Sequence, residues 1–168
     1  EQAQLTATGG ATNDIFGNNV AISGDTAIVG AFFDDVGANT DQGSAYVFIR
    51  SGAVWTQQAQ LTAAGGAAFD YFGYSVSISG DTVVVGANLD DVGLNSNQGS
   101  AYVFVRDGAT WSQQSQLTAT AGAAFDEFGR SVAISGDKII VGAPYSNVSG
   151  SVPLAPQAAD QGARHVAA

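Results

Sequence analysis

Short segments of alternating apolar and polar residues follow one another along this chain, with glycine-containing turns between them. Val20 and Ile22 alternate with smaller or polar residues, which predicts a half-buried strand over residues 16–23. A Gly-Asp pair follows and favours the positive φ angles of a two-residue hairpin turn. The apolar residues after this turn predict a second strand over residues 26–31.

Two more strands complete the unit after a polar loop over residues 32–42. Residues 43–50 are rich in aromatic and β-branched side chains, which favours a strand. Residues 54–63 predict a fourth strand with an outward polar face. No segment has a convincing helical period, so the sequence predicts an all-β chain.

The whole unit recurs with a period of 56 residues, because each copy starts with Phe-Gly at Phe16, Phe72 or Phe128. A fixed period of this size indicates an array of one supersecondary unit. Four antiparallel strands in each unit predict the blades of a β-propeller. The blades are expected over approximately residues 8–63, 64–119 and 120–168, the last together with a strand over residues 2–7.

The repeats are shifted in phase by one strand, so that the strands read D-ABCD-ABCD-ABC. Residues 2–7 match the fourth strand of the other copies, and residues 160–166 match residues 41–47 after a longer loop. Three blades are too few to close a ring of this type. We therefore expect one domain over residues 1–168, a half propeller that another chain completes, or else a piece of a longer propeller.

N-terminal strand exchange is the route of self-association that this phase shift predicts. A strand that lacks a neighbour exposes unpaired N–H and C=O groups, which favours pairing with another chain. Reciprocal exchange between two copies gives a homodimer, and exchange that does not close gives a fibre.

The start and the end of the unit, Phe-Gly and Gly-Ala-Pro, resemble the FG-GAP repeat. This repeat is the blade unit of the integrin α-subunit propeller and of many bacterial surface proteins. The resemblance covers nearly the whole chain and implies a propeller fold. In integrins it also implies a calcium loop, Asp-x-Asp-x-Asp-Gly, between the first two strands of a blade. Here the tight turn over residues 23–25 takes that place, and the pattern is missing from all three copies.

Acidic and amide residues recur instead in the loop between the second and third strands. Oxygen ligands in a flexible loop that contains glycine suit Ca²⁺, which we expect as the cofactor. The alternative is a solvated loop in which Asp and Asn side chains cap turns. Asp14, Asp70 and Asp126 are expected either to add a carboxylate or to cap a turn. The candidate metal ligands are Asp34, Asp35, Asn39, Asp41, Asp90, Asp91, Asn95 and Asn97.

Composition removes several classes of function. The net charge is −10 with only five Lys and Arg residues, which argues against a nucleic-acid or anionic-membrane surface. No apolar run approaches the roughly 18 residues of a membrane span. Cysteine is absent, so disulfides and thiolate chemistry are excluded.

Catalysis has little support in the sequence. His165 is the only histidine and occupies a position that is tyrosine in the other repeats, and no Gly-x-Ser-x-Gly elbow is present. The repeated Phe-Gly pairs are expected to pack between blades. Trp55 and Trp111 are expected to pack under the blade rim rather than to form a sugar-stacking platform. The chain is therefore predicted to be no enzyme.

The predicted function is a non-enzymatic module for binding, adhesion or structural assembly, outside the cell or on its surface. A protein or a glycan surface is its expected ligand. The alternative is a fragment of a larger propeller enzyme, carbohydrate-active or another hydrolase, with its site in the loops or in missing blades.

Overall fold

The computed structural model describes residues 3–146 and 164–167. Its first sheet contains four strands in chain order, each antiparallel to the next. These strands are β1 (Val20–Ser23), β2 (Thr26–Ala31), β3 (Ser44–Ser51) and β4 (Val54–Leu61). We call this sheet the first blade.

The second blade repeats the first strand by strand. It is again a four-stranded antiparallel sheet in chain order, made of β5 (Phe72–Ser79), β6 (Thr82–Ala87), β7 (Ser100–Asp107) and β8 (Thr110–Leu117). An irregularity in register recurs between Val47 and Phe48 and between Val103 and Phe104. The predicted four-stranded antiparallel unit is confirmed for these two repeats.

The third blade contains β9 (Ser131–Ser135), β10 (Lys138–Gly142) and β11 (Arg164–Ala167). The strand β10 is antiparallel to β9 but parallel to β11, with Ile139 opposite His165. The match of residues 160–166 to the antiparallel third strand is therefore wrong in direction. A parallel neighbour requires a long crossover, and the connection over residues 143–163 is longer than the corresponding connections in the other blades.

The predicted strands near the N-terminus are shorter or missing. Residues 3–19 contain no strand, and β1 begins only at Val20, whereas β5 begins at Phe72, the equivalent of Phe16. A strand forms when a neighbour accepts and donates its backbone hydrogen bonds. Among the described residues no such neighbour lies beside residues 3–7, so this segment is extended chain without a sheet.

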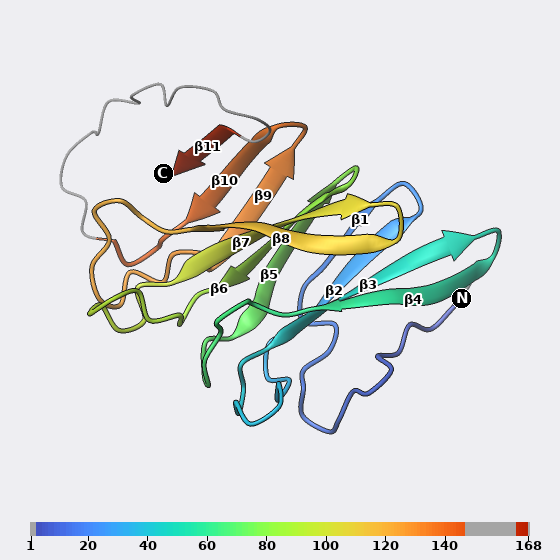
Figure 1. Ribbon diagram of the computed structural model, residues 1–168, viewed down its shortest axis with the longest axis horizontal. Coiled ribbons are helices and arrows are strands. Elements are labelled where there is room, and N and C mark those ends of the chain that lie inside the picture. The colour runs from blue at the N-terminus through green and yellow to red at the C-terminus, as the bar shows by residue number, and fades with distance from the viewer. Residues whose placement is uncertain (1–2, 147–163, 168) are drawn as a thin grey trace.

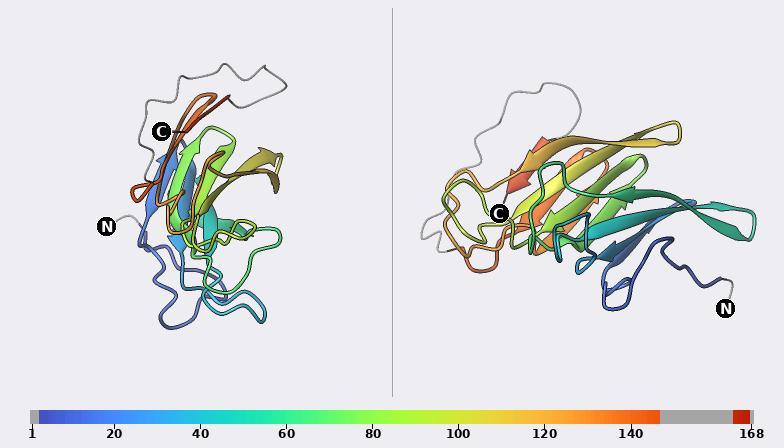
Figure 2. Two further views of the ribbon diagram at one scale, coloured as in Figure 1. Left: turned by 90° about the vertical axis from the view of Figure 1, so that its left-hand side faces the viewer. Right: turned by 60° about the horizontal axis from the view of Figure 1, so that its bottom comes forward.

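The three sheets lie side by side in chain order, with the two termini at opposite ends of the row (Figure 1). Figure 2 shows them from two further sides as successive layers that do not close into a ring. Apolar side chains fill the junctions between them. Phe72 is fully buried in a cluster that joins the first two blades, and Phe128 is buried in a cluster that joins the second and third. The predicted packing of the phenylalanines between blades is confirmed at both junctions.

Glycines let the backbones of neighbouring blades touch at these junctions. A Cβ atom at Gly86 would lie 1.9 Å from the carbonyl oxygen of Gly129. Gly129 has φ +92°, and a Cβ atom there would lie 2.1 Å from the carbonyl oxygen of Ser100. Neither position has room for a side chain, so the Phe-Gly and Gly-Ala pairs of the repeat are both junction residues. Over the described range, no helix is long and apolar enough to cross a membrane.

Candidate functional site

The loops between the second and third strands hold the predicted metal ligands, and Asp34 is the most buried of those in the first blade. Its Oδ2 atom accepts a hydrogen bond of 2.7 Å from the hydroxyl of Tyr46 and one of 2.9 Å from Nε2 of Gln60. Gln60 also donates to the hydroxyl oxygen of Ser44. Asp34 therefore connects the loop to strands β3 and β4 of its own blade.

The same arrangement recurs in the second blade around Asp90. Its Oδ2 atom accepts a hydrogen bond of 2.8 Å from Tyr102 and one of 2.9 Å from Gln116. Burial raises the pKa of the Tyr46 and Tyr102 hydroxyls, and the neighbouring carboxylates raise it further. Both tyrosines stay protonated at neutral pH and act as hydrogen-bond donors.

The other residues of the loop form turn-capping hydrogen bonds. In the first blade, the backbone N–H of Asp41 donates to Oδ1 of Asp35 at 2.9 Å. The Asn39 amide donates to Gln42 and to the carbonyl oxygen of Gly66. The second blade repeats these bonds with Asp91, Asn95 and Asn97 in place of Asp35, Asn39 and Asp41.

These loop residues fit a metal ion poorly in the geometry described. The inner oxygen of Asp34 is taken by two donors, and Asp35 caps a different part of the loop. Within residues 3–146 and 164–167 no group of three or more His, Cys, Asp or Glu residues converges as a metal site. The hydrogen bonds support the capping alternative, and calcium binding by the loops stays a prediction.

Asp14, Asp70 and Asp126 each cap a turn at the start of a repeat. The Oδ2 atom of each accepts a hydrogen bond from the backbone N–H three residues earlier, at 2.5, 2.6 and 2.8 Å respectively. Burial raises the pKa of Asp70 to about 6, although the bond from Ala67 lowers it. The nearby charges of Asp90 and Asp91 raise it further.

Both tryptophans pack on the sheets as expected. Trp111 lies against the core cluster of the first junction, and its indole N–H donates a hydrogen bond of 2.8 Å to Gln58 of the first blade. Trp55 packs against the third core cluster, which contains Leu5 and Ala7 of the N-terminal segment. An arginine of the adjacent strand lies over each indole ring.

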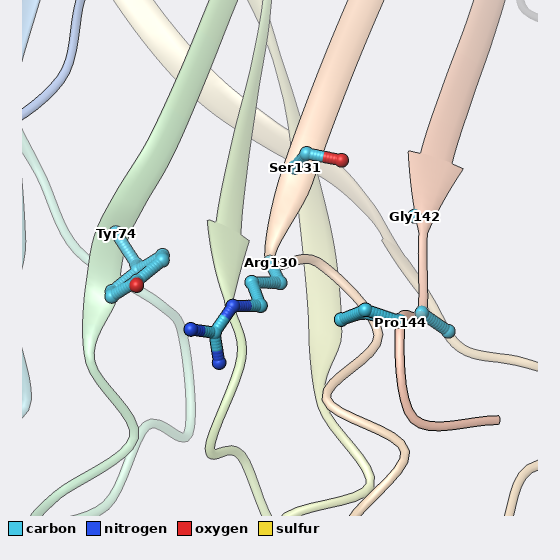
Figure 3. Close-up of a pocket in the computed structure, with 6 residues that line it drawn as sticks. Tyr74, Arg130, Ser131, Gly142 and Pro144 are labelled. Atoms are coloured by element: carbon cyan, nitrogen blue, oxygen red, sulfur yellow. The ribbon is translucent and has the colours of Figure 1, made fainter.

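A cluster that breaks the repeat lies where the first strands begin and the second strands end. Equivalent positions hold Asn18, Tyr74 and Arg130 in the three repeats. The Arg130 guanidinium lies 5.6 Å from the ring centre of Tyr74 and 5.5 Å from that of Tyr145. Figure 3 shows the arginine side chain reaching toward the ring of Tyr74.

Glu127 neutralises this arginine. Arg130 donates a short hydrogen bond to Oε2 of Glu127, which is the main cause of its raised pKa. The same oxygen accepts a bond of 3.1 Å from the amide of Asn88. The Oδ1 atom of Asn88 is buried, and the residues described supply it with no hydrogen-bond donor.

A hollow of about 530 Å³ adjoins the cluster at the outer face of the third blade. An arginine stacked on aromatic rings is suited to binding and packing. It supplies neither a nucleophile nor a general base at neutral pH. The residues that line the hollow are Tyr74, Arg130, Ser131, Gly142, Ala143 and Pro144.

Aromatic side chains extend the cluster toward the first blade. The ring of Phe32 lies 5.6 Å from that of Tyr71 and 5.3 Å from that of Tyr74, both in edge-to-face geometry. Sequence reasoning did not identify this cluster, because it followed what the repeats share. The sequence pattern that reveals it is the opposite one, namely the positions at which the three copies differ.

The family model described as FG-GAP repeat matches the chain three times, over residues 1–48, 55–104 and 111–153. Each match contains one Phe-Gly pair and the strands that follow it. No curated protein matches the chain.

Proposed function

Because the chain belongs to the FG-GAP repeat family, we propose that it is a non-enzymatic binding and assembly module built from propeller blades. Its place of action is outside the cell or on the cell surface. The proposal rests on the surface that the blades leave available. The repeated polar loops form hydrogen bonds within the fold, whereas large apolar side chains are exposed on the outer faces of the first and third blades.

These exposed side chains carry the proposal. Val20 and Ile22 on β1 are exposed, although their equivalents Val76 and Ile78 are buried in the junction between the first two blades. Ile140 on β10 is exposed, although its equivalent Val84 is fully buried. Apolar patches of this kind are typical of surfaces that bind another protein.

The N-terminal segment is the part of the chain that we propose to pair with another copy. In this scheme residues 2–7 form the fourth strand of a third blade in a second chain, as a homodimer or, if exchange does not close, a fibre. Deletion of residues 1–7 is expected to dissociate the assembly, as measured by light scattering. Leu94→Ala, a change at a fully exposed loop residue, is the matched control and should leave the mass unchanged.

The acidic composition supports an extracellular place and a protein or glycan ligand. A net charge of −10 with few lysines and arginines keeps the molecule soluble and reduces binding to nucleic acid. Protease treatment of intact cells tests the location. Digestion before lysis supports exposure at the surface, and digestion only after lysis contradicts it.

The alternative function is an enzyme fragment, and the Tyr74–Arg130–Glu127 cluster is the observation that favours it. Unlike polar residues gathered at one end of the blades are typical of an active site. We nevertheless propose no hydrolase activity, because these side chains lack an activated nucleophile. Turnover on a panel of glycosides and esters that is lost in Arg130→Ala would contradict the proposal.

A further inference from the structure

The outer face of the third blade has a vacant place for a Phe-Gly pair. At the junction between the second and third blades, the Ser75 hydroxyl donates a hydrogen bond of 2.7 Å to the carbonyl oxygen of Gly129. Gly86 lies against the same oxygen. In the third blade these two positions are Ser131 and Gly142, and both line the hollow of about 530 Å³.

The outer face of the first blade has the complementary vacancy. Val20 and Ile22 are 65% and 64% exposed, against 5% and 8% for their equivalents Val76 and Ile78. A second hollow, of about 440 Å³, lies between these two side chains and the N-terminal segment around Leu5. A Cβ atom at Gly17 would meet nothing within 4 Å, so this Phe-Gly pair has no blade against it among the described residues.

The N-terminal segment already lies where the last strand of a preceding blade belongs. The N–H of Thr8 donates a hydrogen bond of 2.7 Å to Gln57, as the N–H of Ala64 donates one of 2.8 Å to Gln113. Leu5 and Ala7 pack with Phe16 and Trp55 in the third core cluster. At the first junction, Leu61 and Ala63 pack in the same way with Phe72 and Trp111.

The third core cluster is thus one half of a junction. The complete cluster at the first junction also contains Ile28, from the second strand of the preceding blade. The equivalent of Ile28 in the third blade is Ile140, which is 54% exposed, whereas Ile28 and Val84 are fully buried. The side chain that the first-blade face lacks is therefore present on the third-blade face.

We propose that the first blade of a second copy of this chain docks on the third blade of the first. This inference rests on the proposed assembly function and specifies its surface. Ile140 enters the hollow beside Val20 and Ile22 of the second copy. The Ser131 hydroxyl donates to the carbonyl oxygen of the second copy's Gly17, and Gly142 lies against that oxygen.

One further hydrogen bond fixes the register of this contact. In the two junctions within the chain, Gly80 donates its N–H to the Ser23 hydroxyl and Gly136 to the Ser79 hydroxyl, both at 3.1 Å. The next equivalent pair is Gly24 of the second copy and Ser135 of the first. The new junction therefore continues, residue by residue, an interface that the chain already forms twice, and this continuity identifies the occupant as a second copy.

Two such junctions, related by a twofold axis, close two chains into a ring of six blades. This number lies within the usual range for propellers. Each chain contributes one third-blade face and one first-blade face, so that no unlike partner is required.

Light scattering of the 168-residue chain tests the proposal. The wild type is expected at twice its 16.9 kDa at micromolar concentration. Ile22→Lys and Ile140→Lys each place an unpaired charge in the junction and are expected to weaken dimerisation by at least about 100-fold. Val54→Lys is the matched control, because Val54 is also a strand residue, is 64% exposed and lies outside the proposed contact.

A mixture of the two variants distinguishes this contact from other modes of assembly. Ile22→Lys retains an intact third-blade face and Ile140→Lys an intact first-blade face, so mixing them is expected to restore dimers joined by one junction. A wild-type dimer that survives both substitutions would overturn the proposed surface and leave the assembly function standing. A wild-type monomer would overturn both, and a larger assembly that Ile22→Lys dissociates would support the junction without the six-bladed closure.

Discussion

Gly30 and Gly73 meet across the junction of the first two blades, where a Cβ atom at Gly30 would lie 2.0 Å from the carbonyl oxygen of Gly73. Gly73 has φ +94°, and a Cβ atom there would lie 2.2 Å from the carbonyl oxygen of Ser44. Glycine ends one unit and begins the next because backbone, rather than side chain, fills the space between them.

This contact predicts a difference between equivalent glycines. Gly30→Ala and Gly86→Ala push two backbones apart and are expected to lower the free energy of unfolding by at least about 2 kcal/mol. Gly142→Ala meets only the movable hydroxyl of Ser131 and is expected to be tolerated. Denaturant unfolding at concentrations too low for self-association measures all three. Equal losses for the three variants would contradict this account.

The buried tyrosine–aspartate pairs give a second prediction. Tyr46→Phe and Tyr102→Phe remove a donor from a buried carboxylate, and each is expected to cost about 1–3 kcal/mol of unfolding free energy. Tyr145→Phe is the control, because Tyr145 is exposed and its ring still faces Arg130 without the hydroxyl. We expect this control to change stability by less than about 0.5 kcal/mol. Similar losses for all three would show that the Asp34 and Asp90 bonds are not important.

Asp70 predicts a specific dependence on pH. Its pKa is raised by burial from 3.8 to about 6, so the folded protein binds this proton more tightly than the unfolded chain does. The resulting stabilisation is fully present below about pH 4 and is lost as the pH rises through about 6, with a slope of at most about 1.4 kcal/mol per unit.

Asp70→Asn tests this dependence, because the amide oxygen still accepts the bond from the N–H of Ala67 but no longer titrates. Unfolding free energies of both proteins measured between about pH 4 and pH 7 are expected to diverge in favour of the variant as the pH rises. Parallel pH curves for the two proteins would contradict the assignment.

Calcium binding by the acidic loops is open to a direct titration. Millimolar calcium added to EDTA-treated protein is expected to raise the melting temperature by mass action. Asp34→Ala with Asp90→Ala is expected to remove that rise, but it also breaks buried hydrogen bonds. Asp35→Asn with Asp91→Asn is the cleaner variant, because the amide oxygen can keep the turn cap while the charge is lost. No rise in the wild type would leave these loops as hydrogen-bonded turns.

Sequence patterns predict local features of this fold well. The alternation around Val20 and Ile22, the Gly-Asp turns and the 56-residue period together predict the strand order of the first two blades, because neighbouring strands are joined by short turns. The direction of β11 could not be predicted in this way. A long connection leaves both directions open, and the resemblance of residues 160–166 to an earlier strand indicated the wrong one.

The candidate site depends on contacts that local patterns do not contain. Asp34 is held by Tyr46 and Gln60, which are 12 and 26 residues away along the chain and reach it only through the register of three strands. A recurring acidic loop therefore indicates polar chemistry without showing which atoms already have partners. Arg130 and Tyr74 were missed for a related reason, since each is unremarkable in its own repeat and gains its meaning from the other.

The backbone contact between glycines has a consequence for how such arrays change over evolutionary time. A junction of this kind depends on very few side chains, so an in-frame duplication of one whole unit creates a blade that already fits both neighbours. Deletion of one whole unit likewise joins two faces that were complementary beforehand. Partial duplications misplace the glycines and fail at once. Blade number can therefore vary in whole steps, while the loops at the ends of the blades, where Asn18, Tyr74 and Arg130 differ, remain free to diverge.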